Sequence, residues 1–306
     1  MKHLIYLLII PFLLSSFLIS CSAEEEGPLT DYPNSYLLLS AEDLYGMMDM
    51  FEQMEADSGI FLIDARAEPG DSLIPGATHF SAIAELTDPD YPVDHYLIGP
   101  DLFQEKMRNL GLNNDSMVII YDDGNHLAAA RLFYAMDYYG FSRARLLNGG
   151  MAAWTEAGLP ISDQYAVHEP GSFQFDVQEA LMCDFDYIME ASNDPNKIIF
   201  DARSAGEYSG EVVRSERGGH VPNAVNLEWS KVLEPEGVPT FLPAEEIRVL
   251  FEELGITPDK EVIPHCQSNV RGSHAYFTLR LMGYDSVRPY EGSWAEYGNR
   301  SDAVIQ

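Results

Sequence analysis

The residues best suited to chemistry in this sequence are a cysteine and an arginine five positions apart, Cys266 and Arg271. The run 261–264 before the cysteine predicts a strand, and a helix is expected to follow. A thiol at the start of a helix lies among free backbone N–H groups, at the positive end of the helix dipole. These surroundings favour a thiolate nucleophile and can also hold an anion. The 266–271 loop therefore predicts a cysteine nucleophile that handles an anionic group, with Arg271 as its counter-charge.

The alternative is a buried structural cysteine at the end of a strand. Three cysteines are too few for a disulfide framework. Cys21 belongs to an N-terminal leader, and Cys183 falls in a predicted helix, 182–189, as a small buried apolar side chain. A disulfide between Cys183 and Cys266 would conflict with the nucleophilic role, and the sequence leaves it open.

The elements that position this loop follow from the pattern of apolar runs. The runs 60–63 and 117–121 are short and continuous, as in strands buried in a parallel sheet. Residues 101–110 predict a helix closed by Gly111. Strands that alternate with helices indicate an α/β fold with a mainly parallel sheet.

The second half of the chain repeats the first at offsets of about 137 to 147 residues, in the same order. The matched pairs include 198–203 with 61–66, 220–227 with 73–80, and 261–265 with 117–121. We therefore expect two copies of one domain, each with a five-stranded sheet flanked by helices. The predicted boundaries are 1–21 leader, 22–34 acidic tether, 35–160 first domain, 161–175 linker and 176–306 second domain.

The repeat places Asp122 opposite Cys266. A carboxylate can satisfy the backbone N–H groups of such a loop, but it cannot carry sulfur. We therefore expect a structural first domain and a catalytic second domain.

The composition is strongly acidic, with 49 Asp and Glu against 18 Lys and Arg, and a net charge of −31. Such a surface repels a phosphate backbone, which argues against a nucleic-acid partner. A hydrophobic content of 46% is sufficient for packed cores. We expect a monomer.

The N-terminus begins with the basic residues of Met1-Lys2-His3, and 4–19 is almost entirely apolar. Small residues precede Cys21, so the segment resembles a bacterial lipoprotein signal in which this cysteine is lipidated. The run is short for a spanning helix, although an uncleaved membrane anchor is the alternative. Both interpretations predict an extracytoplasmic protein held at a membrane.

Four motifs together resemble the tandem-domain rhodaneses, which are thiosulfate and 3-mercaptopyruvate sulfurtransferases. The resemblance covers about residues 35–306. The motifs are 201–204 with Glu207, Tyr208 and Gly210; 219–224; the 266–271 loop; and 292–294.

The resemblance implies a double displacement without metal or organic cofactor. Cys266 takes a sulfane sulfur from the donor as a persulfide, and a thiophilic acceptor such as cyanide or a thiol removes it. The amides of Gln267, Ser268, Asn269 and Val270, together with Arg271, are expected to bind the anionic groups. Arg203 is a further candidate for substrate contact, with a structural ion pair as its alternative.

Several residues depart from the family pattern. Asn269 and Asn223 stand where glycine is usual, and asparagine tolerates positive φ best after glycine. Glu207 stands where the mercaptopyruvate enzymes have an arginine. Their loops are also small and uncharged, whereas this loop has Gln267 and Arg271, so thiosulfate is the expected donor and mercaptopyruvate the alternative. Pro264 in a strand is unusual because it cannot donate to a ladder.

Two rival functions remain open. Cysteine phosphatases share a His-Cys-(five residues)-Arg loop, but only four residues separate Cys266 from Arg271 here. The shorter loop suits a single sulfur atom better than a tetrahedral phosphate. The other rival is a non-catalytic surface protein that uses the same fold for binding.

Overall fold

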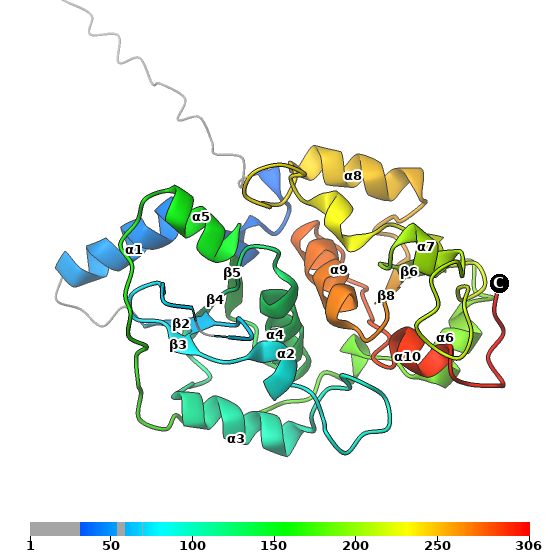
Figure 1. The fold of residues 1–306 in the computed structure, drawn as a ribbon, viewed down its shortest axis with the longest axis horizontal. Helices are drawn as coiled ribbons and strands as arrows, with labels where there is room; N and C mark the ends of the chain where they lie inside the picture. The colour runs from blue at the N-terminus through cyan, green and yellow to red at the C-terminus, as the bar shows by residue number, and fades with distance from the viewer. Residues whose placement is uncertain (1–30, 54–58, 69) are drawn as a thin grey trace, which may run out of the picture.

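The computed structural model describes residues 31–53, 59–68 and 70–306 (Figure 1). The predicted leader, with Cys21, and the tether up to residue 30 lie outside the described residues. No helix in the described ranges has the length and apolar character needed to cross a bilayer.

The first domain is built on a five-stranded sheet in which all pairings are parallel, in the order β1-β5-β4-β2-β3. Its strands are β1 (Leu38–Leu39), β2 (Ile60–Asp64), β3 (Thr78–His79), β4 (Met117–Tyr121) and β5 (Ala144–Leu147). Its helices are η2 (Ser35–Leu37), α1 (Ala41–Gln53), α2 (Ala82–Glu85), α3 (Pro100–Leu110), α4 (Leu127–Tyr138) and α5 (Gly150–Glu156). Helix α3 ends at Gly111, whose φ of 101° confirms the predicted glycine cap.

The second domain has a smaller regular sheet, in the order β7-β6-β8, again parallel. Its strands are β6 (Lys197–Asp201), β7 (Val225–Asn226) and β8 (Glu261–His265). Its helices are η3 (Glu179–Leu181), α6 (Phe185–Ala191), α7 (Ala205–Tyr208), η4 (Trp229–Val232), α8 (Ala244–Glu253), α9 (Val270–Leu281) and α10 (Ser293–Tyr297). Single parallel bridges, Val262 with Val287 and Cys183 with Tyr290, occupy the positions of the two further strands we expected.

Pro264 explains part of this reduction from five strands to three. In a parallel ladder its nitrogen would donate to the carbonyl of Arg288, but proline has no N–H group. The Cys183 thiol donates to that carbonyl instead, with Sγ 3.6 Å from the oxygen. Cys183 thus precedes α6 rather than lying within a helix, so that prediction was wrong.

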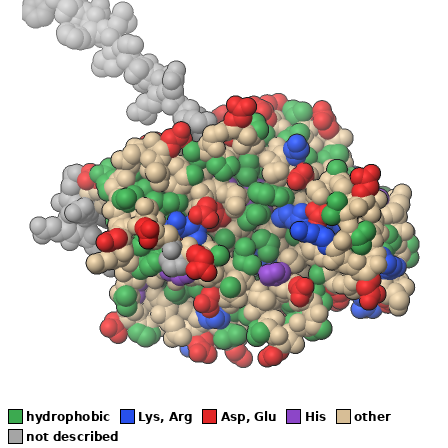
Figure 2. All heavy atoms as spheres, in the orientation of Figure 1, with side chains coloured by type: hydrophobic (Ala, Val, Ile, Leu, Met, Phe, Trp, Pro, Cys, Tyr) green, Lys and Arg blue, Asp and Glu red, His purple; other side chains and the backbone are tan. Residues whose placement is uncertain are grey.

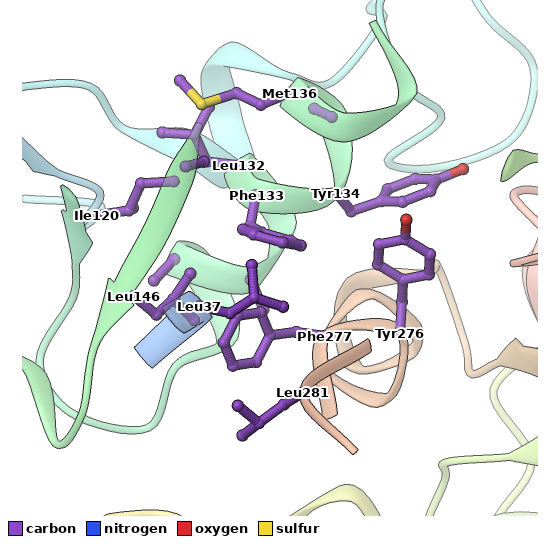
Figure 3. Packing of buried hydrophobic residues seen from close by; sticks show 14 of the residues in the cluster. Leu37, Ile120, Leu132, Phe133, Tyr134, Met136, Leu146, Tyr276, Phe277 and Leu281 are labelled. Carbon is purple, nitrogen blue, oxygen red and sulfur yellow. The ribbon is translucent and has the colours of Figure 1, made fainter. Parts of the chain in front are cut away.

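The two domains meet along helices α4 and α9, which follow the equivalent strands β4 and β8. Aromatic side chains fill this contact, as Figure 3 shows. Phe133 packs edge-on against Phe277 with ring centroids 4.9 Å apart, and Tyr134 does the same against Tyr276 at 5.2 Å. These residues belong to one buried cluster that spans both domains, so the helices that begin at the two loops are packed directly together.

The segment predicted as a linker, 161–175, runs back along the first domain. Its backbone bonds to that domain at four places. Ser162 pairs with Leu73, and the amides of Ala166, Gly171 and Phe173 donate to the carbonyls of Ala77, Arg108 and Leu112.

Candidate active site

Cys266 lies directly after β8, where the carboxyl end of a parallel strand meets the start of α9. The residue is 1% exposed. The start of α10 holds the loop from the other side, because the Trp294 amide donates to the Cys266 carbonyl at 2.9 Å. The Ala295 amide donates to Gln267 at 2.7 Å. The thiol therefore lies in a fixed loop, beneath the surface.

Ser293 organises the amides around the cysteine. Its Oγ accepts from the amides of Cys266, at 3.3 Å, and Asn269, at 3.1 Å, and donates to the Tyr290 carbonyl at 3.0 Å. In the part of the chain that is described, the amides of 267, 268, 270 and 271 have no hydrogen bond. Of the amides of residues 267–271, all except that of Asn269 are thus available to an anion.

Asn269 adopts the left-handed conformation that was predicted for it, with φ 54° and ψ 14°. Asn223 does the same, with φ 62°. The Asn269 side chain is buried, and its Nδ2 donates to Glu291 Oε2 at 2.6 Å. This asparagine therefore adds an anchor that a glycine at the same position would lack.

Gly272 makes room for that anchor. A Cβ atom there would lie 2.2 Å from Asn269 Oδ1, far inside van der Waals contact. We expect Gly272→Ala to lower the unfolding free energy by about 1–3 kcal/mol, because one of two buried groups must move. Urea denaturation would measure the loss. Gly46→Ala is the control, because nothing lies within 4 Å of a Cβ at that helical glycine. An equal change in both variants would contradict this account.

Arg271 is not a free counter-charge, because its guanidinium is shared with Glu207. Nη1 and Nη2 donate to the two carboxylate oxygens at 2.7 and 2.9 Å. Burial opposes the charge, but the bond to Glu207 and the nearby Cys266 raise the pKa of Arg271. Burial also acts against ionised Glu207, yet Arg271 holds the pKa of that carboxyl at about 2. Both groups are charged at neutral pH.

Arg214 is a candidate that the sequence analysis missed. Its side chain is 58% exposed, and its Nη1 lies 3.6 Å from Glu207 Oε1. Gln267 Nε2 contacts the neighbouring Ser215 Oγ at 3.2 Å, which ties this segment to the 266–271 loop. Figure 2 shows that the largest group of basic side chains on the displayed face lies over the second domain. No local pattern around Arg214 distinguishes it, since its place depends on Glu207 and Gln267.

Arg203 is buried inside the second domain, where its guanidinium is bonded to groups of that domain. It is 1% exposed, and its Nη2 lies 2.6 Å from Asp201 Oδ2 and 2.8 Å from the Gly219 carbonyl. Its guanidinium also lies 4.2 Å from the centre of the Trp294 ring. These contacts favour the ion-pair alternative over the predicted substrate contact.

The equivalent loop of the first domain is filled by Asp122. Its carboxylate accepts from the amides of Gly124, His126, Ala128 and Ala129, at 2.9 to 3.2 Å. Burial raises the pKa of Asp122, and these four donors act against that effect. The carboxylate satisfies the backbone N–H groups of its loop, as expected, so the amides that would hold a substrate anion are occupied.

Cys183 and Cys266 are both free, so the disulfide between them that the sequence left open is not formed. Burial raises the pKa of Cys183. Among the residues described, no three His, Cys, Asp or Glu side chains are grouped to hold a metal ion.

Comparison with known proteins agrees with this fold and site. The rhodanese-like domain family matches residues 40–157 and 184–300. The sulfur carrier protein TtuD of Thermus thermophilus is 35% identical over 80% of this chain and 87% of its own length. The thiosulfate sulfurtransferase of Azotobacter vinelandii is 34% identical over 64% of this chain and 72% of its own length. The 3-mercaptopyruvate sulfurtransferase of Escherichia coli is 30% identical over 82% of this chain and 93% of its own length.

A solved structure extends the likeness to three dimensions. The anaerobic ergothioneine biosynthesis enzyme of Chlorobium limicola superposes with a TM-score of 0.79 at 25% identity, over 90% of this chain and 71% of that one. The chain belongs to the rhodanese-like family, with the domain present twice. It is a sulfurtransferase of the rhodanese type, as the names of its relatives indicate.

Proposed function

We propose that this protein moves the sulfane sulfur of thiosulfate to a thiophilic acceptor through a persulfide on Cys266. The observation that carries the proposal is the loop itself, which places one thiol beside a charged arginine and four amides that have no hydrogen bond to the described residues. The thiol of Cys183 has no such setting, and Asp122 replaces the thiol in the first domain.

The reaction balances as two displacements. The Cys266 thiolate attacks the outer sulfur of thiosulfate, the bond between the two sulfur atoms breaks, and sulfite leaves with the electron pair. The resulting persulfide anion is stabilised by the loop amides and Arg271. An acceptor such as cyanide then attacks the outer sulfur and leaves as thiocyanate, which restores the thiolate. Because Cys266 is buried, a donor must present its sulfur end-on.

The Glu207 pair favours thiosulfate over mercaptopyruvate. Both terminal nitrogens of Arg271 are bonded to Glu207, so its fork is not free to bind a substrate carboxylate in the bidentate manner. Positive potential alone attracts the thiosulfate dianion without a bidentate bond, and the exposed guanidinium of Arg214, beside Glu207, adds to that potential. The four residues between Cys266 and Arg271, one fewer than in a cysteine phosphatase, argue against a phosphatase.

The test is mass spectrometry of the intact protein after thiosulfate treatment. The wild-type protein should gain the mass of one sulfur atom and lose it again on addition of cyanide. Cys266→Ser should gain nothing, whereas Cys183→Ser should behave as the wild type. No gain in the wild-type protein would support the non-catalytic binding alternative. Rates with thiosulfate and mercaptopyruvate, measured in parallel, would then identify the donor.

We further propose that the protein is a monomeric lipoprotein of the cell envelope, anchored through Cys21. The support is the sequence 1–21 alone, with its basic start, apolar run and cysteine. The full-length chain should partition into membranes, and Cys21→Ser should abolish lipidation of the mature N-terminus. An unmodified N-terminus in the wild-type protein would refute this.

A further inference from the structure

Glu291 joins the first domain to the 266–271 loop of the second. The residue is 1% exposed, and four donors reach its carboxylate. Oε1 accepts from Arg131 Nη2 at 2.6 Å and from the Leu97 amide at 2.9 Å. Oε2 accepts from Arg131 Nη1 at 3.2 Å and from Asn269 Nδ2 at 2.6 Å. Three of the four donors come from the first domain.

Arg131 is suited to fix a position. It lies on α4, is 1% exposed, and presents two parallel N–H donors to the carboxylate. Its Nη2 also donates to the His95 carbonyl at 2.9 Å, which ties the guanidinium to its own domain, and its Nη1 donates to Ser273 Oγ of the second domain at 3.4 Å. A buried ion pair is weak evidence of stability, but its geometry is restrictive. Glu291 can therefore occupy only a narrow range of positions relative to α4.

The constraint continues from Glu291 to the thiol. Glu291 holds the side chain of Asn269, the left-handed residue at which the loop turns into α9. The amide of Asn269 shares the Ser293 hydroxyl with the amide of Cys266. A shift of Asn269 would thus move the amides that surround the sulfur.

We propose that Arg131 of the first domain is a positioning residue for the Cys266 loop, acting through Glu291 and the side chain of Asn269. The proposal rests on Cys266 being the nucleophile. It gives the first domain, whose own loop is filled by Asp122, a part in the active site of the second.

The test is the rate of Cys266 alkylation by iodoacetamide as a function of pH, in the full-length protein. Mass spectrometry of the digested peptides would distinguish alkylation of Cys266 from alkylation of Cys183. The charged groups near Cys266 are Arg271, with its partner Glu207, and Arg131, with its partner Glu291. The double variant Arg131→Met/Glu291→Gln removes one such pair whole, so no buried charge is left alone.

In this double variant we expect slower alkylation of Cys266. The pH at which the alkylation rate reaches half its maximum should rise by about half a unit, which corresponds to an about threefold change in the equilibrium between thiol and thiolate. Asn269→Gly should give the same shift, because it cuts the same contact while glycine keeps the positive φ. The matched control is Arg280→Met, which breaks another ion pair across the α4–α9 interface, Arg280 to Asp137 at 2.8 Å. That control should keep the wild-type midpoint even if its thermal stability falls.

Adding Asn269→Gly to the double variant should cause no further change, because both act on one chain of contacts. A wild-type midpoint in the double variant, or shifts that add, would overturn the proposal. If the double variant does not fold, Arg131→Lys keeps the charge but not the fork, and should shift the midpoint in the same direction. If instead the wild-type protein takes no sulfur from thiosulfate, the proposed donor fails, while the alkylation profile still reports on Arg131.

Discussion

Replacing Asp201 with alanine is expected to lower the unfolding free energy of the protein by about 3–5 kcal/mol. Asp201 is fully buried at the end of β6, and its carboxylate bonds to the side chain of Arg203 at 2.6 to 3.0 Å. The substitution leaves the Arg203 guanidinium, 1% exposed, without its counter-charge. Urea denaturation of the variant and the wild-type protein measures the difference.

The control for this prediction has the same spacing in the sequence but no burial. Arg300 and Asp302 form an ion pair at 2.8 Å, with side chains 41% and 61% exposed. Because water screens exposed pairs, Asp302→Ala should leave the unfolding free energy almost unchanged. Comparable losses in the two variants would show that burial does not decide the effect. Asp201→Ala should also impair sulfur transfer, because Arg203 packs on Trp294, whose amide holds the Cys266 carbonyl.

The parts of the site that could be predicted are those encoded locally. The strand, loop and helix around Cys266 follow from a run of residues, and the positive φ of Asn269 follows from the residue type. The internal repeat placed Asp122 in the equivalent loop, and its four amide bonds follow from that placement. In each case a few neighbouring residues fix the backbone, so the sequence contains the necessary signal.

The parts that could not be predicted depend on contacts between distant residues. Glu207 lies 64 positions from Arg271, and Arg131 lies 160 positions from Glu291. Neither pairing has a spacing rule, because packing of the domains decides which charges meet. Arg271, which was expected to be a free counter-charge, is therefore paired with Glu207, and the sequence did not indicate Arg214. The smaller second sheet is an intermediate case, since Pro264 was conspicuous but its effect depended on Arg288 and Cys183.

Glu207→Gln is expected to change the donor preference of the enzyme. Glutamine keeps the shape of the side chain and can occupy the same position in the capping box that Ser204 begins. It removes the negative charge that now occupies both nitrogens of Arg271. The freed fork can bind a carboxylate, so kcat/KM for mercaptopyruvate should rise about tenfold, equivalent to about 1.4 kcal/mol. The kcat/KM for thiosulfate should rise less, because binding of thiosulfate does not require a bidentate bond from the guanidinium.

Parallel steady-state kinetics with both donors would measure this change in preference. The control is Glu211→Gln, which removes a carboxylate from the same exposed segment that carries Arg214, and should leave the ratio of the two donors unchanged. An unchanged ratio in Glu207→Gln would mean that the pairing of Arg271 does not select the donor.

The stability of the protein at acid pH tests the ion pair of Glu207 and Arg271 independently of the kinetics. The pKa of Glu207 is about 2 in the folded protein, against an ordinary value of 4.5. A carboxyl with a lowered pKa contributes stability that is present above pH 4.5 and is lost as the pH falls towards 2. The wild-type protein should therefore lose this contribution across that range, and Glu207→Gln should lack it at every pH. Unfolding curves between pH 5 and pH 2 that fall in parallel for the two proteins would show that Arg271 does not hold Glu207 ionised.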